Sequence, residues 1–143
     1  MLIAAFKGEP TIRECALAIL SEPSLDFYYS PLLKLEVTLQ PTHHVFNKEL
    51  AFYDLYFRNA NIFGNLNHIF EIGCPEALKH GITVMDALHL AAAKLSRCQL
   101  FITTEKPTKS KTREITPLFR TTLIKVVSIA TITQPSQARA LLT

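Results

Sequence analysis

The sequence predicts an α/β fold in which a central parallel sheet is covered by helices on both faces. Segments with apolar residues at helical spacing alternate along the chain with short segments that are continuously apolar. Continuously apolar strands are typical of parallel sheets buried on both faces. The chain has 143 residues, of which 48% are hydrophobic. This is enough apolar material for one domain with its own core, and it excludes a wholly disordered chain.

The first half of the chain predicts three helices and one strand. Pro10 opens the first helix, where Thr11 and Glu14 have the spacing of a capping box. Ser30 followed by Pro31 is typical of an N-cap and the first turn of the next helix. The expected elements are a helix from 10 to about 20, a strand at 27–29, a helix at 32–39 and a helix from about 47 to 61.

The second half predicts two helices and two strands. Pro75 is expected to begin a short helix that Gly81 ends, and the preceding segment 64–73 has no clear pattern. The other expected elements are a helix at 83–95 and strands at 100–103 and 123–129. One face of the helix at 83–95 should pack against the sheet, through Leu88, Ala91, Ala92 and Leu95. We expect one domain over 1–129 and a frayed tail over 130–143.

The net charge of +3 is unevenly distributed, because basic residues concentrate in the polar loop between the last two strands. Lys106, Lys109 and Lys111 in this loop are candidate contacts to phosphate groups, and a merely solvated loop is the alternative. No apolar run reaches the roughly 18 residues of a membrane helix. Three scattered cysteines without a CxxC motif argue against a disulfide framework or a zinc knuckle. We therefore expect a cytoplasmic protein with reduced thiols and no membrane partner.

Three acidic residues lie where an α/β sheet binds ligands. Glu36 is on the second turn of the helix after the first strand, Asp86 is in the first turn of its helix, and Glu105 follows a strand. Ligands of parallel sheets collect at the carboxyl ends of the strands. Converging ionised carboxylates are what Mg²⁺ or Mn²⁺ requires, and a water on such an ion can be activated to attack a phosphodiester.

Each of these acids also has a purely structural interpretation. Thr83 and Asp86 have the spacing of a capping box. Glu36 by itself is typical of a solvated helix residue, and Glu105 by itself is typical of a loop. His89, one turn after Asp86, is more often a packed or supporting histidine than a metal ligand.

Taken together, three segments resemble the PIN domain, particularly the small ribonuclease toxins of VapC type. Residues 29–36, Tyr-Ser-Pro-Leu-Leu-Lys-Leu-Glu, are similar to the strand, serine, helix and second acid of the family. Residues 81–93, Gly-Ile-Thr-Val-Met-Asp-Ala-Leu-His-Leu-Ala-Ala-Ala, are similar to the segment around its third acid and are the most specific part. Residues 100–106 are similar to its strand ending in Thr-x-Asp, with Glu105 replacing Asp. The resemblance covers roughly residues 1–129.

The resemblance implies a three-layer sandwich, with a central parallel sheet flanked by helices, that hydrolyses RNA with Mg²⁺ or Mn²⁺. Glu36 and Asp86 would be metal ligands, and Glu105 would be a ligand or would hold a metal-bound water. Ser30 and Thr103 would support the site by hydrogen bonds. The resemblance also implies three partners: RNA, a cognate antitoxin and a second copy of the chain.

The sequence departs from the family at its N-terminus. The family begins with a strand, central in the sheet, that ends in a catalytic Asp a few residues before a segment like 2–6. Here no acid precedes Glu9, so we expect the first strand and first acid to be missing and RNA cleavage to be weak or absent. Two hypotheses remain: a toxin-type endoribonuclease, and a weakened PIN-like module that binds RNA or an antitoxin. A generic phosphate-binding domain is disfavoured, because the four glycines form no Gly-rich loop.

Overall fold

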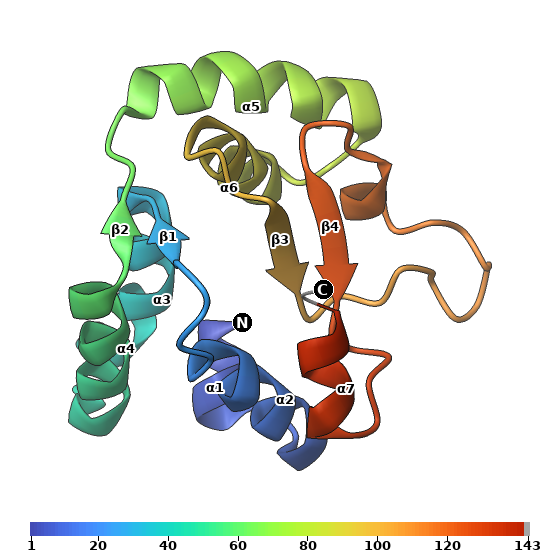
Figure 1. The fold of residues 1–143 in the computed structure, drawn as a ribbon. Coiled ribbons are helices and arrows are strands. Elements are labelled where there is room, and N and C mark those ends of the chain that lie inside the picture. Colours follow the sequence, from blue (N-terminus) through green and yellow to red (C-terminus); the bar gives the residue numbers. More distant parts are fainter. Residues whose placement is uncertain (142–143) are drawn as a thin grey trace.

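The computed structural model describes residues 1–141 as a mixed α/β protein (Figure 1). Its helices are α1 (Leu2–Lys7), α2 (Pro10–Leu20), α3 (Pro31–His43), α4 (Asn47–Asn59), α5 (Leu66–His80), α6 (Val84–Leu95), the 3₁₀ helix η1 (Pro117–Arg120) and α7 (Pro135–Ala140). Its strands are β1 (Tyr28–Tyr29), β2 (Asn61–Ile62), β3 (Leu100–Thr103) and β4 (Lys125–Ser128).

The four strands form two separate sheets of two strands each. β1 pairs in parallel with β2, and β3 pairs in parallel with β4. Figure 1 shows β1 and β3 apart, with α6 at one end of the gap between them. The expected parallel pairing is therefore confirmed within each pair, but one continuous central sheet is not seen in the part of the chain that the structure describes.

Several expected helix ends are confirmed because they depend on local chemistry. The Ser30 side chain accepts a hydrogen bond from the Leu33 N–H at 3.4 Å and caps α3. Gly81 follows α5 in the left-handed conformation, with φ of 66°, which glycine adopts at little cost. At α2, however, the expected capping box of Thr11 and Glu14 is wrong, because the helix begins at Pro10 and its N-cap is Glu9.

Two other expectations are corrected by α5. Most of the segment 64–73, which had no clear pattern, and the short helix expected from Pro75 belong to one helix of 15 residues. The N-cap of this helix is Asn65, whose side chain accepts a hydrogen bond from the His68 N–H. Pro75 lies inside this helix rather than at its start. Pro75 is exposed, so the backbone bond that it removes lies on the side of α5 away from α6. The opposite face, with Ile69 and Gly73, is buried.

The apolar residues of α6 pack against two different partners, helix α5 and the β3–β4 sheet. Leu88, Ala91 and Ala92 are buried, as expected, but they cluster with Ile69 of α5 and not with the strands of a sheet. The residues that face β3 and β4 are Ala87 and Leu90, which cluster with Phe101 and Val126. Helix α6 is buried on two faces because it lies between α5 and the sheet, and Leu95 is only partly buried.

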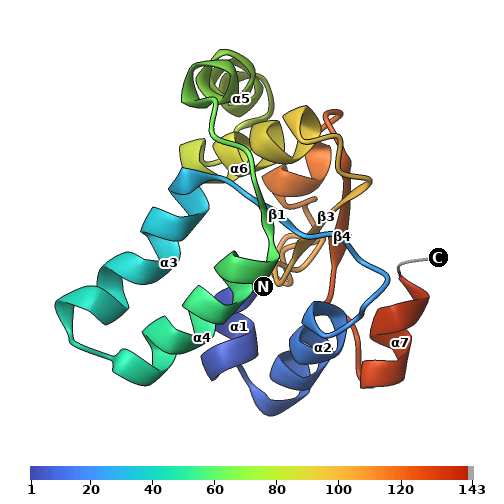
Figure 2. The same cartoon turned by 60° about the vertical axis from the view of Figure 1, so that its left-hand side comes forward.

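The end of the chain is not frayed, as the sequence had led us to expect. Residues 135–140 form α7, which packs on α2 (Figure 2). Ala138 is fully buried in one cluster with Cys15 and Ile19 of α2. The tail therefore completes a hydrophobic core made by α1, α2 and α7. Residues 142 and 143 of the expected tail lie outside the part of the chain that the structure describes. Within residues 1–141, no helix is both long enough and apolar enough to cross a membrane.

Candidate active site

A cavity of about 670 Å³ lies between the two sheets. Both residues of β1 and all four residues of β3 line it, and one face of α6 contributes Asp86, His89 and Ala93. The three acids singled out by the sequence, Glu36, Asp86 and Glu105, all line this one cavity. They come from three separate elements: α3, the first turn of α6, and the segment after β3. Tertiary structure thus brings together residues up to about 70 positions apart in the chain.

Glu36 is held by a histidine from another helix. Its Oε2 atom lies 2.8 Å from Nε2 of His89, which is on α6. The His89 side chain is 11% exposed and that of Glu36 is 44% exposed, so the pair lies at the rim of the cavity. One carboxylate oxygen of Glu36 is therefore engaged by the protein, and the other has no partner among the described residues.

Asp86 is fixed by the cap of its own helix. The hydroxyl of Thr83 accepts a hydrogen bond from the Asp86 N–H at 3.2 Å and donates one to Asp86 Oδ2 at 2.5 Å. The capping interpretation is therefore confirmed for Thr83, which is the N-cap, whereas the Asp86 carboxylate accepts from the Thr83 hydroxyl and not from the Thr83 N–H. A side chain that caps can still line a cavity, and Asp86 does both.

Glu105 and Asp86 influence each other electrostatically. Partial burial of the Glu105 carboxyl, and secondly the negative charge of Asp86, raise the pKa of Glu105 above its ordinary value. The charge of Asp86 thus acts on Glu105 across the cavity that both residues line.

The backbone of Glu105 is anchored from both strands of its sheet. The Thr103 hydroxyl accepts a bond from the Glu105 N–H at 3.1 Å. The Ser128 hydroxyl donates to the Glu105 carbonyl and accepts from the Ala130 N–H. Thr103 and Ser128 are both buried, so these bonds are shielded from water. The sequence did not predict a role for Ser128, although a serine that ends β4 directly after Val126 and Val127 was a usable signal.

Ser30 supports the site in a less direct way than expected. It is buried and lines the cavity, but among the described residues its side chain is bonded only to the first turn of α3. It thereby fixes the start of the helix that carries Glu36. Ser30 is thus a positioning residue for α3, and no bond joins it to an acid among the described residues.

The basic loop leaves the cavity at Glu105. Lys106, Lys109 and Lys111 are all exposed. The loop is ordered by backbone bonds, including Lys109 N–H to Glu114 carbonyl at 2.9 Å, and Figure 1 shows it projecting away from β1 and β2. Lys106 adjoins the site directly, whereas Lys109 and Lys111 belong to the projecting part.

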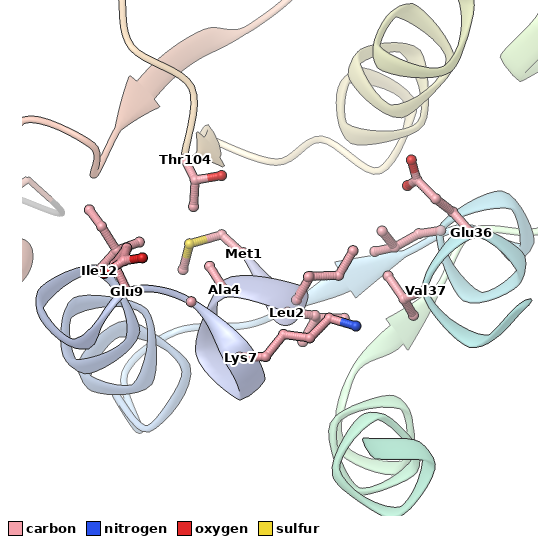
Figure 3. Close-up of a pocket in the computed structure, with 12 residues that line it drawn as sticks. Met1, Leu2, Ala4, Lys7, Glu9, Ile12, Glu36, Val37 and Thr104 are labelled. Atoms are coloured by element: carbon pink, nitrogen blue, oxygen red, sulfur yellow. The ribbon is translucent and has the colours of Figure 1, made fainter. Parts of the chain in front are cut away.

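A second cavity of about 460 Å³ adjoins the first and shares Met1, Leu2, Leu33, Glu36 and Thr104 with it. Figure 3 shows Met1 beside Thr104, with Glu36 on the other side of this cavity. The amino group of Met1 is buried, and this burial lowers its pKa, while the nearby charge of Glu36 opposes the shift.

Within residues 1–141, no group of three or more His, Cys, Asp or Glu side chains is arranged so that it could hold a metal ion. The three acids share a cavity but do not form a closed ligand set, and Glu36 and Asp86 are engaged by His89 and Thr83. Their oxygen donors suit a hard cation such as Mg²⁺, which keeps several of its own waters. The chemistry of the donors thus fits such an ion, while the present side-chain positions leave them apart.

No protein-family model, no curated protein and no solved structure matches this chain. What the cavity does must therefore be argued from its own residues.

Proposed function

We propose that this chain is a metal-dependent endoribonuclease of the PIN type, the toxin of a toxin–antitoxin pair. One observation carries the proposal: Glu36, Asp86 and Glu105, from three different elements, line a single cavity. Two further features support it. The acids Asp86 and Glu105 are electrostatic neighbours, and an exposed basic loop begins at Lys106, beside the cavity. Such a loop attracts the phosphates of RNA whatever the base sequence.

In this proposal Glu36, Asp86 and Glu105 would hold Mg²⁺ or Mn²⁺. A bound ion of this kind supplies a water activated for attack on a phosphodiester. The chain's own residues place the acids: Thr83 holds Asp86, His89 holds Glu36, and Thr103 with Ser128 holds the Glu105 backbone. Lys106 would attract the backbone of the RNA to the acids.

The proposal includes a finer description of the fold as a PIN-like three-layer sandwich. In it, the β1–β2 and β3–β4 sheets are two halves of one parallel sheet. Helix α6 supports this, because it contacts both β1 and β3. The domain would then span 1–129, with α7 as an addition that closes the core.

The alternative is a module that binds RNA or an antitoxin but cuts poorly. The bonds from His89 to Glu36 and from Thr83 to Asp86 favour it, because both acids already have protein partners. A protein partner, either an antitoxin or a second copy, is supported by large apolar side chains exposed on α3, α4 and β2. They are Leu35, Leu39, Leu55 and Ile62.

The decisive experiment measures cleavage and metal binding on the same set of variants. A fluorescent single-stranded RNA is incubated with the protein in Mg²⁺ or Mn²⁺, with EDTA as control, and Mn²⁺ binding is followed by electron paramagnetic resonance. We expect weak cleavage that EDTA and Asp86→Asn both abolish, since Asn retains an acceptor for Thr83 but carries no charge. Glu71→Gln is the matched control, because Glu71 is an exposed acid on α5 outside the cavity.

The outcomes separate the two hypotheses. If Asp86→Asn cuts as well as its parent, the three-acid site is wrong. If the parent binds RNA but is inert on varied RNAs with both metals, the binding module is favoured. If Glu71→Gln also lost activity, the loss in Asp86→Asn would be due to the change in net charge and not to the proposed site.

A further inference from the structure

The turn that joins α3 to α4 is an exposed tip of the molecule. Residues 42–48 are all exposed, and Figure 2 shows this turn at the end of the α3–α4 hairpin that lies away from α5 and α6. Val45 and Phe46 are 70% and 51% exposed. Neither side chain belongs to a hydrophobic core cluster within residues 1–141. The tip therefore presents two large apolar side chains to a ligand rather than to the core.

The backbone of the tip is held in an unfavourable conformation. Val45 is left-handed, with φ of 58°. A β-branched residue is strongly disfavoured in this region, and glycine is the usual residue directly after a helix. Two backbone bonds fix the turn: the Phe46 N–H donates to the Pro41 carbonyl at 2.8 Å, and the Val45 N–H donates to the Thr42 carbonyl at 3.3 Å. A turn that only connected two helices would be more stable with glycine, so the valine points to a role for the exposed surface.

Three rings of the tip lie against one another. The centroids of His43 and His44 are 4.9 Å apart in an edge-to-face arrangement, and His44 stacks on Phe46 with 5.5 Å between centroids and 26° between planes. All three side chains are exposed. Unpaired bases of single-stranded nucleic acids stack on Phe and His rings, whatever their sequence. In a duplex the faces of the bases are covered by neighbouring base pairs, so this row of rings suits a single strand.

The charge of the tip suits the same ligand. No acidic residue lies between Glu36 and Glu49. The carboxylate of Glu49 is buried and is engaged by Lys7 and Tyr53. Lys48, at the start of α4, is exposed. Rings beside a free lysine, in a stretch without acids, are complementary to bases joined by phosphates.

A membrane surface is the other ligand with phosphates, and the tip suits it less well. Segments that bind at a membrane surface are typically helices with one continuous apolar face and a polar face rich in Lys and Arg. In the turn 42–48, only Val45 and Phe46 are apolar, and Lys48 is the only Lys or Arg. Single-stranded nucleic acid is therefore the class of ligand that the tip favours.

We propose that the α3–α4 tip is a second RNA site, which binds unpaired bases by stacking on His44 and Phe46 and attracts the phosphates through Lys48. Helix α3 joins this site to the cavity, because it carries Glu36 in its second turn and reaches His43 about 10 Å further along its axis. RNA bound at the tip is thereby kept near the acids. This inference deepens the proposed function and rests on it for the choice of RNA, but stacking at the tip does not require cleavage.

The test measures RNA binding without any metal. Fluorescence anisotropy of a labelled single-stranded RNA of about 12 nucleotides is followed in EDTA, so that no metal-dependent cleavage occurs. Phe46→Leu keeps an apolar side chain but removes the ring, and Phe70→Leu is the matched control, because Phe70 is 42% exposed on the distant helix α5. We expect Phe46→Leu to raise the Kd about fivefold or more and Phe70→Leu to leave it unchanged. Phe46→Trp should bind at least as tightly as the parent, since it keeps a ring.

A duplex RNA of the same length gives a second measurement, because paired bases cannot stack on the tip. Phe46→Leu should bind this duplex as the parent does. Equal binding of the single strand by Phe46→Leu and its parent overturns the proposal, and so does an equal loss in Phe70→Leu or a parent that binds no RNA. If Phe46→Leu loses only binding to vesicles of phosphatidylcholine and phosphatidylserine, the tip is a membrane contact and the RNA site is wrong.

Cleavage in Mg²⁺ is assayed separately on the same proteins. A parent that binds single strands through Phe46 but cuts none of them contradicts the ribonuclease and supports the tip site. A parent that cuts RNA, with binding in EDTA that does not depend on Phe46, supports the ribonuclease and overturns the tip site.

Discussion

Glu49 is a carboxylate that folding removes almost completely from water. It is 3% exposed, and it accepts a bond from the Tyr53 hydroxyl at 2.7 Å and lies 2.8 Å from Lys7 Nζ. Burial raises the pKa of Glu49, but the hydrogen bonds from Lys7 and Tyr53 and the charge of Lys7 outweigh it. The pKa therefore falls below its ordinary value. Because Lys7 is on α1 and Glu49 on α4, this ion pair ties the N-terminal helix to the α3–α4 hairpin.

Replacing Lys7 should destabilise the protein in a pH-dependent way. We expect Lys7→Met to lower the free energy of unfolding by about 1–3 kcal/mol at pH 7, since a buried carboxylate loses a charged partner. An acid with a lowered pKa stabilises the fold above its unfolded value of about 4.5, and this stabilisation is lost as the pH falls through the folded value. In urea unfolding, the difference in unfolding free energy between Lys7→Met and its parent should therefore shrink as the pH falls from 7 to about 3.5. Lys48→Met, at an exposed neighbour, is the control, and an equal loss at both pH values would contradict the assignment.

The coupling of Asp86 and Glu105 can be tested without any metal or RNA. The negative charge of Asp86 is the second cause of the raised pKa of Glu105, after burial. Asp86→Asn should therefore lower the pKa of Glu105 partway toward its ordinary value, as followed by ¹³C NMR of the carboxyl groups. Glu36→Gln should leave it less changed, because Asp86 and not Glu36 is the charge acting on Glu105. An unchanged Glu105 pKa in Asp86→Asn would show that the two acids are not neighbours.

At the scale of elements, the α5–α6 contact depends on a glycine. A Cβ atom on Gly73 would lie 2.8 Å from Cδ2 of Leu88 and 3.1 Å from the Ala87 carbonyl oxygen. Helices α5 and α6 therefore approach each other closely at Gly73, where α5 has no side chain. A glycine inside a helix is unfavourable by itself, so this one is explained by packing.

Gly73→Ala should destabilise the protein although it improves helix propensity. The propensity gain is about 0.5–1 kcal/mol, and the overpacking cost against Leu88 is about 1–3 kcal/mol, so the clash decides the sign. Leu88→Ala alone should cost about 2–5 kcal/mol, because Leu88 is buried. In the Leu88→Ala background Gly73→Ala should cost less in chemical denaturation, because the contact with Cδ2 of Leu88 is gone and only the tight contacts with the α6 backbone remain. Additive effects in this double-mutant cycle would show that the two positions do not touch.

At the scale of the whole molecule, the last helix, α7, completes the hydrophobic core that α1 and α2 begin. Ala138 of α7, Cys15 and Ile19 of α2 and Ala5 of α1 are buried in one cluster. Burial also raises the pKa of the Cys15 thiol, which lowers its reactivity. Both ends of the chain therefore depend on each other for burial.

Removing residues 134–143 should make Cys15 reactive. In a background of Cys74→Ser and Cys98→Ser, we expect truncation to raise the rate of labelling by Ellman's reagent about tenfold or more, since local opening limits access to buried thiols. Ala138→Glu in the full chain should act in the same direction, and Ser136→Glu, at an exposed position of α7, should not. A Cys15 that stays unreactive in the truncated chain would show that α7 is not needed to cover it.

The sequence by itself determined the elements whose signals are local. Ser30 and Pro31 predicted the start of α3, Gly81 predicted the end of α5, and Thr83 predicted the cap of α6. These predictions are correct because capping and left-handed conformations depend on a few neighbouring residues. The continuously apolar segment at 100–103 predicted β3 for a similar reason, and the parallel pairing within each sheet followed from the same pattern.

Tertiary structure alone decided how the elements meet. Sequence placed Glu36, Asp86 and Glu105 near the carboxyl ends of strands, but the bond from His89 to Glu36 and the anchoring of Glu105 by Ser128 join residues 53 and 23 positions apart. Local pattern wrongly predicted that Pro75 begins a helix and that the tail is frayed. Packing of α5 on α6 and of α7 on α2 outweighs such weak local preferences. Whether four strands make one sheet or two depends on what lies between β1 and β3. That is a matter of long-range pairing, which no short segment of sequence contains.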